Sequence, residues 1–295
     1  GTLRITATDN DFLYPTSSGH GGIQINAQAD TNLLADINGN DFVGLANNGL
    51  FLTNALEFLN GGTADADITV RNNNIRSIAN GGGISIGAIG GTVDTDISNN
   101  TITAINGDAN AIRVHAIGAI VGATIAGNSI GETNLLWPAS PSNSGSGVDL
   151  YAGAGGTLTT SVTNNQITGF APQFGSIVSL KASTSGAPAT LSATVSGNTL
   201  QDTEFQSFGR VELFTLAGTS SANSGTVNLS FANNNLQSGS FNLFKGAGGT
   251  LNVTQADAGA LNASNNAIGS VSAGATFSQP APAAPSLPSL PLLSL

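Results

Sequence analysis

Apolar and polar residues alternate over short stretches throughout the chain, and most stretches end at Gly, Asn or Ser. In one example, Asp96 to Ile105, Ile97 and Ile102 flank a pair of asparagines. Alternation with a period of two predicts short β-strands, because successive side chains of a strand point to opposite faces. Helices are disfavoured, since the stretches are short, rich in β-branched residues and interrupted by Gly and Asn.

The same phrase recurs along the chain, with an Asn two positions before an aliphatic residue or Phe. The recurring residues are Asn10, Asn40, Asn73, Asn100, Asn128, Asn165, Asn198, Asn234 and Asn266. Their average spacing of about 32 residues is typical of a solenoid built from one repeated unit.

Each period also contains an apolar–variable–apolar triplet, usually after a small residue. The triplets begin at Ile23, Leu50, Ile84, Ile112, Val148, Val178, Val211 and Phe241. With one strand leading into the Asn corner and one leaving it, every period supplies three short strands.

These strands predict an all-β fold, a single-stranded right-handed parallel β-helix of about nine coils with three short strands per coil. A β-sandwich is disfavoured because its turns would recur about every 8–12 residues. Asn tolerates the left-handed conformation of a sharp turn, and its amide can bond to its copy one coil away. We therefore predict a structural ladder of Asn40, Asn73, Asn100, Asn128, Asn165, Asn198, Asn234 and Asn266 at the corners.

The repeat predicts one elongated domain over residues 1–278, followed by a Pro/Leu-rich tail over residues 279–295. Five of the ten prolines lie in this tail, which favours an extended polyproline conformation and cannot join the sheets. Its leucines are unfavourable in water, so we expect docking or assembly through them more than a simple linker. They are Leu287, Leu290, Leu292, Leu293 and Leu295.

Composition narrows the possible partners. The chain has 7 Lys+Arg against 17 Asp+Glu, a net charge of −10, and no basic stripe, which excludes nucleic acid as a partner. It contains no Cys, and no apolar run is long enough to span a bilayer. The absence of Met and a start in mid-repeat indicate a processed or excised segment. We expect a secreted or cell-surface protein, of bacterial type.

The repeats resemble the right-handed parallel β-helix superfamily, which includes pectate-lyase-like enzymes, phage tailspikes and bacterial adhesin or autotransporter passenger domains. The resemblance covers about residues 2–272 and depends on the three-strand coil and on corners such as Asn72-Asn73-Asn74-Ile75 and Asn164-Asn165-Gln166-Ile167. It implies an architecture only, because function is added to such scaffolds locally. No catalytic signature of the superfamily can be placed on this sequence.

Charged residues that are scarce elsewhere gather at the variable positions of the triplets and just after them. These positions are expected to face solvent and to stack from coil to coil. The candidates are Arg113, His115, Asp149, Tyr151, Lys181 and Glu212. In a lyase, Arg113 and Lys181 would bind an acidic sugar, with His115 or Tyr151 as base or acid. An inverting hydrolase would instead use two carboxylates, Asp149 and Glu212, about 10 Å apart across two coils.

The alternative for this face is a solvated surface on which Arg113 pairs with Asp149. Asp65, Asp67, Asp94 and Asp96 could hold Ca²⁺, although ordinary turn aspartates explain them as well. We therefore predict no metal and no cofactor. Three loops rich in apolar residues, within 55–65, 130–147 and 170–174, are expected to pack locally or to form a contact patch.

Two functions remain open. The first is a structural, adhesin-like β-helix without enzymatic activity, whose uncapped coil ends or tail join copies head to tail into a fibre. Its partners would be itself or other cell-surface components. The alternative is a polysaccharide lyase, hydrolase or glycan-binding protein that uses the charged face.

Overall fold

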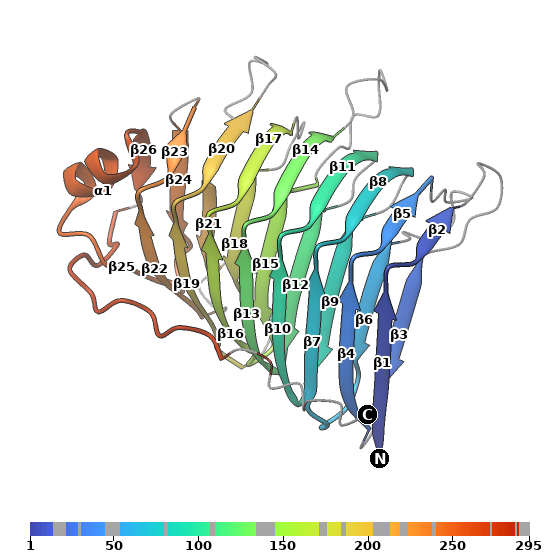
Figure 1. The fold of residues 1–295 in the computed structure, drawn as a ribbon. Helices are drawn as coiled ribbons and strands as arrows, with labels where there is room; N and C mark the ends of the chain where they lie inside the picture. Colours follow the sequence, from blue (N-terminus) through green and yellow to red (C-terminus); the bar gives the residue numbers. More distant parts are fainter. Residues whose placement is uncertain are drawn as a thin grey trace.

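The computed structural model is a parallel β-helix whose coils stack along one axis (Figure 1). It describes residues 1–13, 22–28, 31–44, 54–79, 82–106, 110–133, 145–170, 176–183, 187–202, 213–218, 224–237, 240–271, 273–286 and 288. Three parallel sheets run the length of the molecule, so the predicted solenoid with three strands per coil is confirmed.

Sheet A is formed by the strand that leads into each Asn corner. Its nine strands are β1 (Thr2–Thr8), β4 (Asn32–Asn38), β7 (Ala66–Arg71), β10 (Thr92–Ser98), β13 (Ile120–Ala126), β16 (Thr157–Thr163), β19 (Ala189–Ser196), β22 (Gly225–Ala232) and β25 (Thr250–Val253).

Sheet B is formed by the strand that leaves the corner. Its eight strands are β2 (Asp11–Leu13), β5 (Asp41–Val43), β8 (Asn74–Ala79), β11 (Thr101–Asn106), β14 (Ser129–Thr133), β17 (Gln166–Phe170), β20 (Thr199–Asp202) and β23 (Asn235–Leu236).

Sheet C contains the triplet strands. Its nine strands are β3 (Ile23–Ala27), β6 (Leu56–Asn60), β9 (Ile84–Ile89), β12 (Ile112–Ile117), β15 (Val148–Gly153), β18 (Val178–Ala182), β21 (Leu213–Ala217), β24 (Ser240–Lys245) and β26 (Ile268–Val271).

The core lies between the three sheets and follows from the alternation in the sequence. Parallel pairing without a shift places like residues above like residues: Phe12 pairs with Phe42, and Ile102 with Ile130. The Phe12 and Phe42 rings stack with centroids 4.6 Å apart. Inward residues such as Ile102 and Ile130 are almost fully buried, so burial of apolar side chains stabilises every coil.

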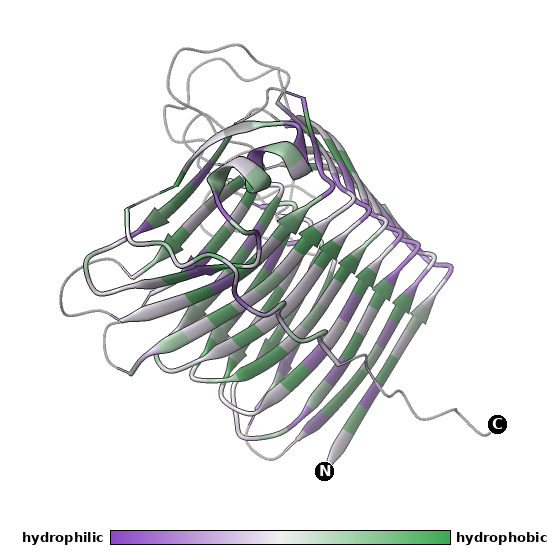
Figure 2. Ribbon diagram, turned by 90° about the vertical axis from the view of Figure 1, so that its left-hand side faces the viewer, coloured by the Kyte–Doolittle hydropathy of each residue, from purple (hydrophilic) through white to green (hydrophobic). Residues whose placement is uncertain are grey.

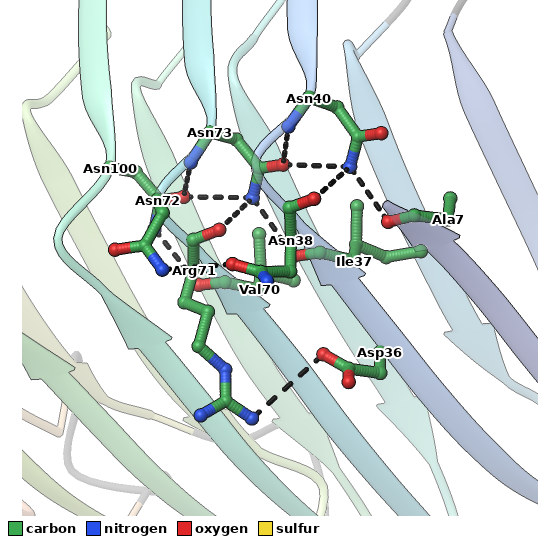
Figure 3. A network of polar contacts seen from close by, with 10 residues as sticks. All are labelled: Ala7, Asp36, Ile37, Asn38, Asn40, Val70, Arg71, Asn72, Asn73 and Asn100. Atoms are coloured by element: carbon green, nitrogen blue, oxygen red, sulfur yellow. Dashed lines mark hydrogen bonds and ion pairs between the residues drawn. The ribbon is translucent and has the colours of Figure 1, made fainter. Parts of the chain in front are cut away.

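The corner asparagines form a continuous ladder of buried amides (Figure 3). In each rung, the backbone N–H and the side-chain Nδ2 of one Asn donate to the Oδ1 of the next; for Asn73 and Asn100 both distances are 3.0 Å. Nδ2 also donates to a backbone carbonyl one coil back, as Asn100 does to Val70 at 2.9 Å. The residue before the ladder Asn has a left-handed φ, for example +56° at Asn72 and +65° at Gly127, as the turn chemistry predicts.

The C-terminal end of the solenoid carries a helix, contrary to the expectation of an uncapped last coil. In that coil α1 (Ala258–Asn265) lies between β25 and β26, where earlier coils have a strand of sheet B. Asp257 caps its N-terminus and accepts a bond from the Ala260 N–H at 2.8 Å. Leu261 and Asn265, four residues apart on one helical face, are fully buried.

The helix also changes the last rung of the ladder. Asn265, not the predicted Asn266, accepts from the Nδ2 of Asn234 at 2.9 Å. Asn266 is instead the helix C-cap, with a left-handed φ of +48°. The ladder therefore begins at Asn10, which donates to Asn40, and ends at Asn265.

After β26 the chain turns back across sheet A (Figure 2). Thr276 bridges to Asn252 of β25, and the Gln279 N–H donates to the Val253 carbonyl at 3.1 Å. Further on, the Ser286 hydroxyl contacts the Asp94 carboxylate of β10. The tail leucines, Leu287, Leu290, Leu292, Leu293 and Leu295, lie outside the described residues.

Candidate functional site

The charged residues predicted on one face are carried by three neighbouring strands of sheet C. Pairing of β12, β15 and β18 places Arg113, Asp149 and Ser179 in one column. The neighbouring column holds His115, Tyr151 and Lys181. We call these six residues the sheet C cluster. Five of the six predicted site residues therefore come together.

Asp149 is the centre of the cluster. Its Oδ2 lies 2.9 Å from Nε2 of His115, and its Oδ1 lies 3.5 Å from Nζ of Lys181. These partners come from the neighbouring column, one strand before and one strand after β15. The predicted pair of Arg113 with Asp149 is absent from the contacts of the described residues: Arg113 donates instead to Nδ1 of His115, at 3.2 Å from Nε and 3.1 Å from Nη2.

The surroundings of His115 determine its tautomer. A guanidinium can only donate hydrogen bonds and a carboxylate can only accept them. The neutral ring therefore carries its proton on Nε2, which donates to Asp149, while Nδ1 accepts from Arg113. Both ring nitrogens are therefore engaged.

The Asp149 carboxylate is charged despite its burial, with only 12% of the side chain exposed. Burial by itself raises the pKa of Asp149. The hydrogen bond from His115, the charge of Lys181 and the Ser179 hydroxyl oppose it, and the net pKa is lowered from 3.8 to about 2. At neutral pH Asp149 is therefore a charged partner for Lys181 and a hydrogen-bond acceptor for His115.

Tyr151 is held beside this group. Its hydroxyl donates to the Ser183 carbonyl at 3.2 Å, and its ring centroid lies 5.3 Å from that of His115. A β-carbon at Gly153 would lie 2.6 Å from the Tyr151 ring, so the absence of a side chain there makes room for the tyrosine. The Tyr151 hydroxyl is thus fixed by the backbone, and it does not contact Asp149.

Two of the predicted triplets are wrong in register. In the second coil Leu56-Glu57-Phe58 forms the strand, within the predicted 55–65 loop, and Gln24 donates to Glu57 at 3.0 Å. The predicted strand at 50–52 lies outside the described residues. In the seventh coil Leu213 pairs with Val178, so Phe214 takes the position opposite Ser179 that was predicted for Glu212. Glu212 itself lies outside the described residues, as do most of the other two predicted loops.

Of the aspartates considered for Ca²⁺, Asp65 precedes β7 and the other three lie on sheet A, where Asp67 pairs with Asp94 and Thr69 with Asp96. Within the described residues no group of three or more His, Cys, Asp or Glu side chains could hold a metal ion. Asp94 instead meets Ser286 of the tail. The described residues also include no helix long and apolar enough to cross a membrane.

The chemistry open to the sheet C cluster is recognition of negative charge more than proton transfer. Arg113 is exposed and Lys181 is 40% exposed, while among the described residues Asp149 is the one carboxylate that contacts them directly or through His115. The group thus carries one excess positive charge in a protein of net charge −10. No family model matches the sequence, and neither a curated protein nor a solved structure matches it.

Proposed function

We propose that this chain is a structural, adhesin-like β-helix of the extracellular space or cell surface, acting through its shape and surfaces without an enzymatic reaction. The observation that carries the proposal is the internal pairing of the sheet C cluster. Both His115 nitrogens are engaged, Asp149 is paired with Lys181, and the Tyr151 hydroxyl is fixed on a carbonyl. Each candidate acid or base is thus held in a contact that stabilises the sheet.

The ladder supports the same role. It joins the nine coils through bonds that run along the solenoid axis, in addition to the sheet hydrogen bonds. A chain cross-connected in this way is suited to hold surfaces and loops at fixed spacing. Head-to-tail assembly remains part of the proposal, but contact through the C-terminal end requires the displacement or accommodation of α1.

A second candidate function is binding of an acidic glycan by the sheet C cluster, without or with cleavage. The exposed guanidinium of Arg113 and the ammonium of Lys181 favour it, since both can bind carboxylate or sulfate groups. Tyr151 adds an aromatic ring between them. A cleaving enzyme would additionally need a free base, which the contacts of His115 do not provide.

The experiment is a comparison of the wild-type chain with Arg113→Ala and Lys181→Ala on immobilised uronic-acid and sulfated glycans. Binding and release of reducing ends or unsaturated products are measured together. The structural role predicts no product from any of the three proteins. Product formation by the wild type that both substitutions abolish would overturn it in favour of the enzyme. Retention of wild type that both substitutions weaken, without product, would establish the glycan-binding function.

A further inference from the structure

The proline-rich segment after β26 follows a defined path over the outer face of sheet A (Figures 1 and 2). It is anchored at Gln279, which bonds to Val253 of β25, and it reaches Ser286 over β13. A β-carbon at Gly122 would lie 3.1 Å from the Ser286 Oγ, and the hydroxyl contacts Asp94 on the next strand. We call residues 280–286 the strap.

The length of the strap fits an extended conformation. Seven residue steps from Gln279 to Ser286 span about 22 Å at the polyproline rise of about 3.1 Å per residue. Crossing from β25 to β13 takes four strand spacings, or about 19 Å. Since prolines lack an N–H, the strap is held by its ends and by side-chain contact more than by backbone bonds.

Charge divides sheet A into two halves, and residues 280–286 cross the uncharged half. The four N-terminal strands carry Arg4, Asp36, Asp67, Arg71, Asp94 and Asp96. The five strands β13, β16, β19, β22 and β25 contain no charged residue. The strap begins at the last of these five strands and ends where the charged strands begin, at Asp94.

The uncharged half has the properties of a surface that pairs with another sheet. Its outward positions are mostly Thr and Ser in straight columns, such as Thr157, Thr190 and Thr226. Stacked neutral residues of high β-propensity, on a sheet of parallel in-register strands, are typical of faces that associate sheet to sheet. Such sheets approach to about 10 Å, which main chain lying across the face prevents.

We propose that the uncharged half of sheet A is a self-association surface, which pairs with the same surface of a second copy of this chain when the strap is lifted. On the half that lacks charge, the strap then prevents a second copy from pairing with the sheet. On the other half the charged side chains prevent this pairing, as charges do at exposed sheet edges generally. The inference extends the proposed structural function, since it gives that scaffold a controlled lateral contact.

A second copy is the partner that the surface fits best. A two-fold axis brings the same surface of both copies together, so two neutral faces meet without charge repulsion. The rest of the protein, whose net charge is −10, repels its copy. Five strands of about seven residues offer a face of about 24 Å by 23 Å per copy. Both copies together then bury about 1,100 Å², which lies near the lower limit for a specific interface and predicts a reversible dimer.

The test is sedimentation analysis of the full chain and of a chain that ends at Gln279, over a wide concentration range. The truncation keeps Thr276 and Gln279, whose backbone bonds hold the end of sheet A. We expect the truncated chain to dimerise at concentrations where the full chain does not. Circular dichroism of both chains establishes that the β-structure is kept.

Two variants identify the surface. Thr159→Lys with Ser192→Lys places charge on two neighbouring strands of the uncharged half, in the row of Gly122, and we expect it to return the truncated chain to the monomer. Gly122→Val in the full chain puts a side chain against both the Asp94 carboxylate and Ser286, which contact each other there, and we expect it to promote dimerisation without truncation.

Three results would each overturn the proposal. The first is a truncated chain that stays monomeric. The second is a truncated chain that still dimerises when it carries both lysines. The third is an assembly of the full chain that truncation dissociates, which would mean that the tail joins copies together. The glycan and product assays do not depend on any of these outcomes. The proposed role of the strap and the proposed structural function can therefore be refuted independently of each other.

Discussion

The Asn ladder can be tested most directly at Asn165, in the middle of the solenoid. Its Oδ1 accepts from the backbone N–H and the Nδ2 of Asn128, both at 2.9 Å. Its own Nδ2 donates to the Ile125 carbonyl at 2.9 Å and to Oδ1 of Asn198 at 3.0 Å. Only 2% of the residue is exposed, so water cannot replace these bonds without rearrangement of the corner.

Asn165→Ala leaves two N–H groups of Asn128 without an acceptor, the backbone N–H and one N–H of Nδ2, whose other N–H keeps the Ile97 carbonyl. Each orphaned buried donor costs about 1–3 kcal/mol, which gives a loss of about 2–6 kcal/mol in the free energy of unfolding. The next residue supplies the control: Gln166 is also an amide, but it is exposed on the first position of β17. Gln166→Ala is expected to change the free energy of unfolding by less than about 0.5 kcal/mol.

Denaturant unfolding followed by far-ultraviolet circular dichroism measures both variants against the wild type. Amide hydrogen exchange then shows where protection is lost, and we expect the loss at the corners of the coils on either side of Asn165. Equal stability of Asn165→Ala and Gln166→Ala would refute the reasoning. Equal stability would mean that the ladder is a consequence of the coil geometry and contributes nothing to the free energy of unfolding.

Two further predictions concern single side chains. Because the pKa of Asp149 is lowered from 3.8 to about 2, its ionisation stabilises the fold above about pH 4, and this contribution of about 2 kcal/mol is lost as pH falls through about 2. Asp149→Asn should therefore show a smaller loss of stability over that pH range than the wild type in urea unfolding; parallel pH curves would contradict this. Asp257→Ala removes the N-cap of α1 and should cost about 0.5–2 kcal/mol, with faster hydrogen exchange at Ala260; unchanged exchange would show that packing alone holds the helix.

The architecture could be predicted from the sequence because the same physical requirement recurs in every coil. A sharp corner needs a residue that tolerates a left-handed φ, followed by an amide that bonds along the axis, and Asn or Gly before Asn satisfies both. At its last copy the pattern selected the wrong residue. Asn266 fits the phrase through Ile268, but the helical turn places Asn265 beside Leu261 on the buried face, and Asn265 forms the rung.

The register of the triplet strands was harder to predict, and the errors have one cause. Leu213 points inward in the predicted triplet and also in the observed one, which begins two residues later. The second coil is displaced by six residues, again an even number. Alternation with a period of two determines which face a residue occupies, but it cannot detect an even shift. The face of the candidate site could therefore be predicted, whereas the assignment of Glu212 to it could not.

The pairing within the sheet C cluster depends on information that the sequence does not contain. Register makes Arg113 and Ser179 the direct neighbours of Asp149, yet its carboxylate binds the diagonal neighbours His115 and Lys181. Direct and diagonal partners are both within reach of long side chains, and the rotamers decide between them. Helix α1 was missed for another reason, since half of its residues are Gly, Ser or Asn, which are typical of turns.

A solenoid exposes two kinds of surface that can pair with another copy, its ends and the outer faces of its sheets. In the described structure α1 lies at the C-terminal end with Leu261 buried, and sheet A has charged residues on one half and the strap on the other. Charged side chains always oppose the pairing of a face with a second copy, whereas a segment held at its two ends can be lifted to expose the face beneath it. The prolines of residues 280–286 favour this role, because a segment in which three of seven residues lack a backbone donor can lie across a sheet without joining it. Lateral association would then be governed by one short segment, while the Asn ladder keeps the coils beneath it in register.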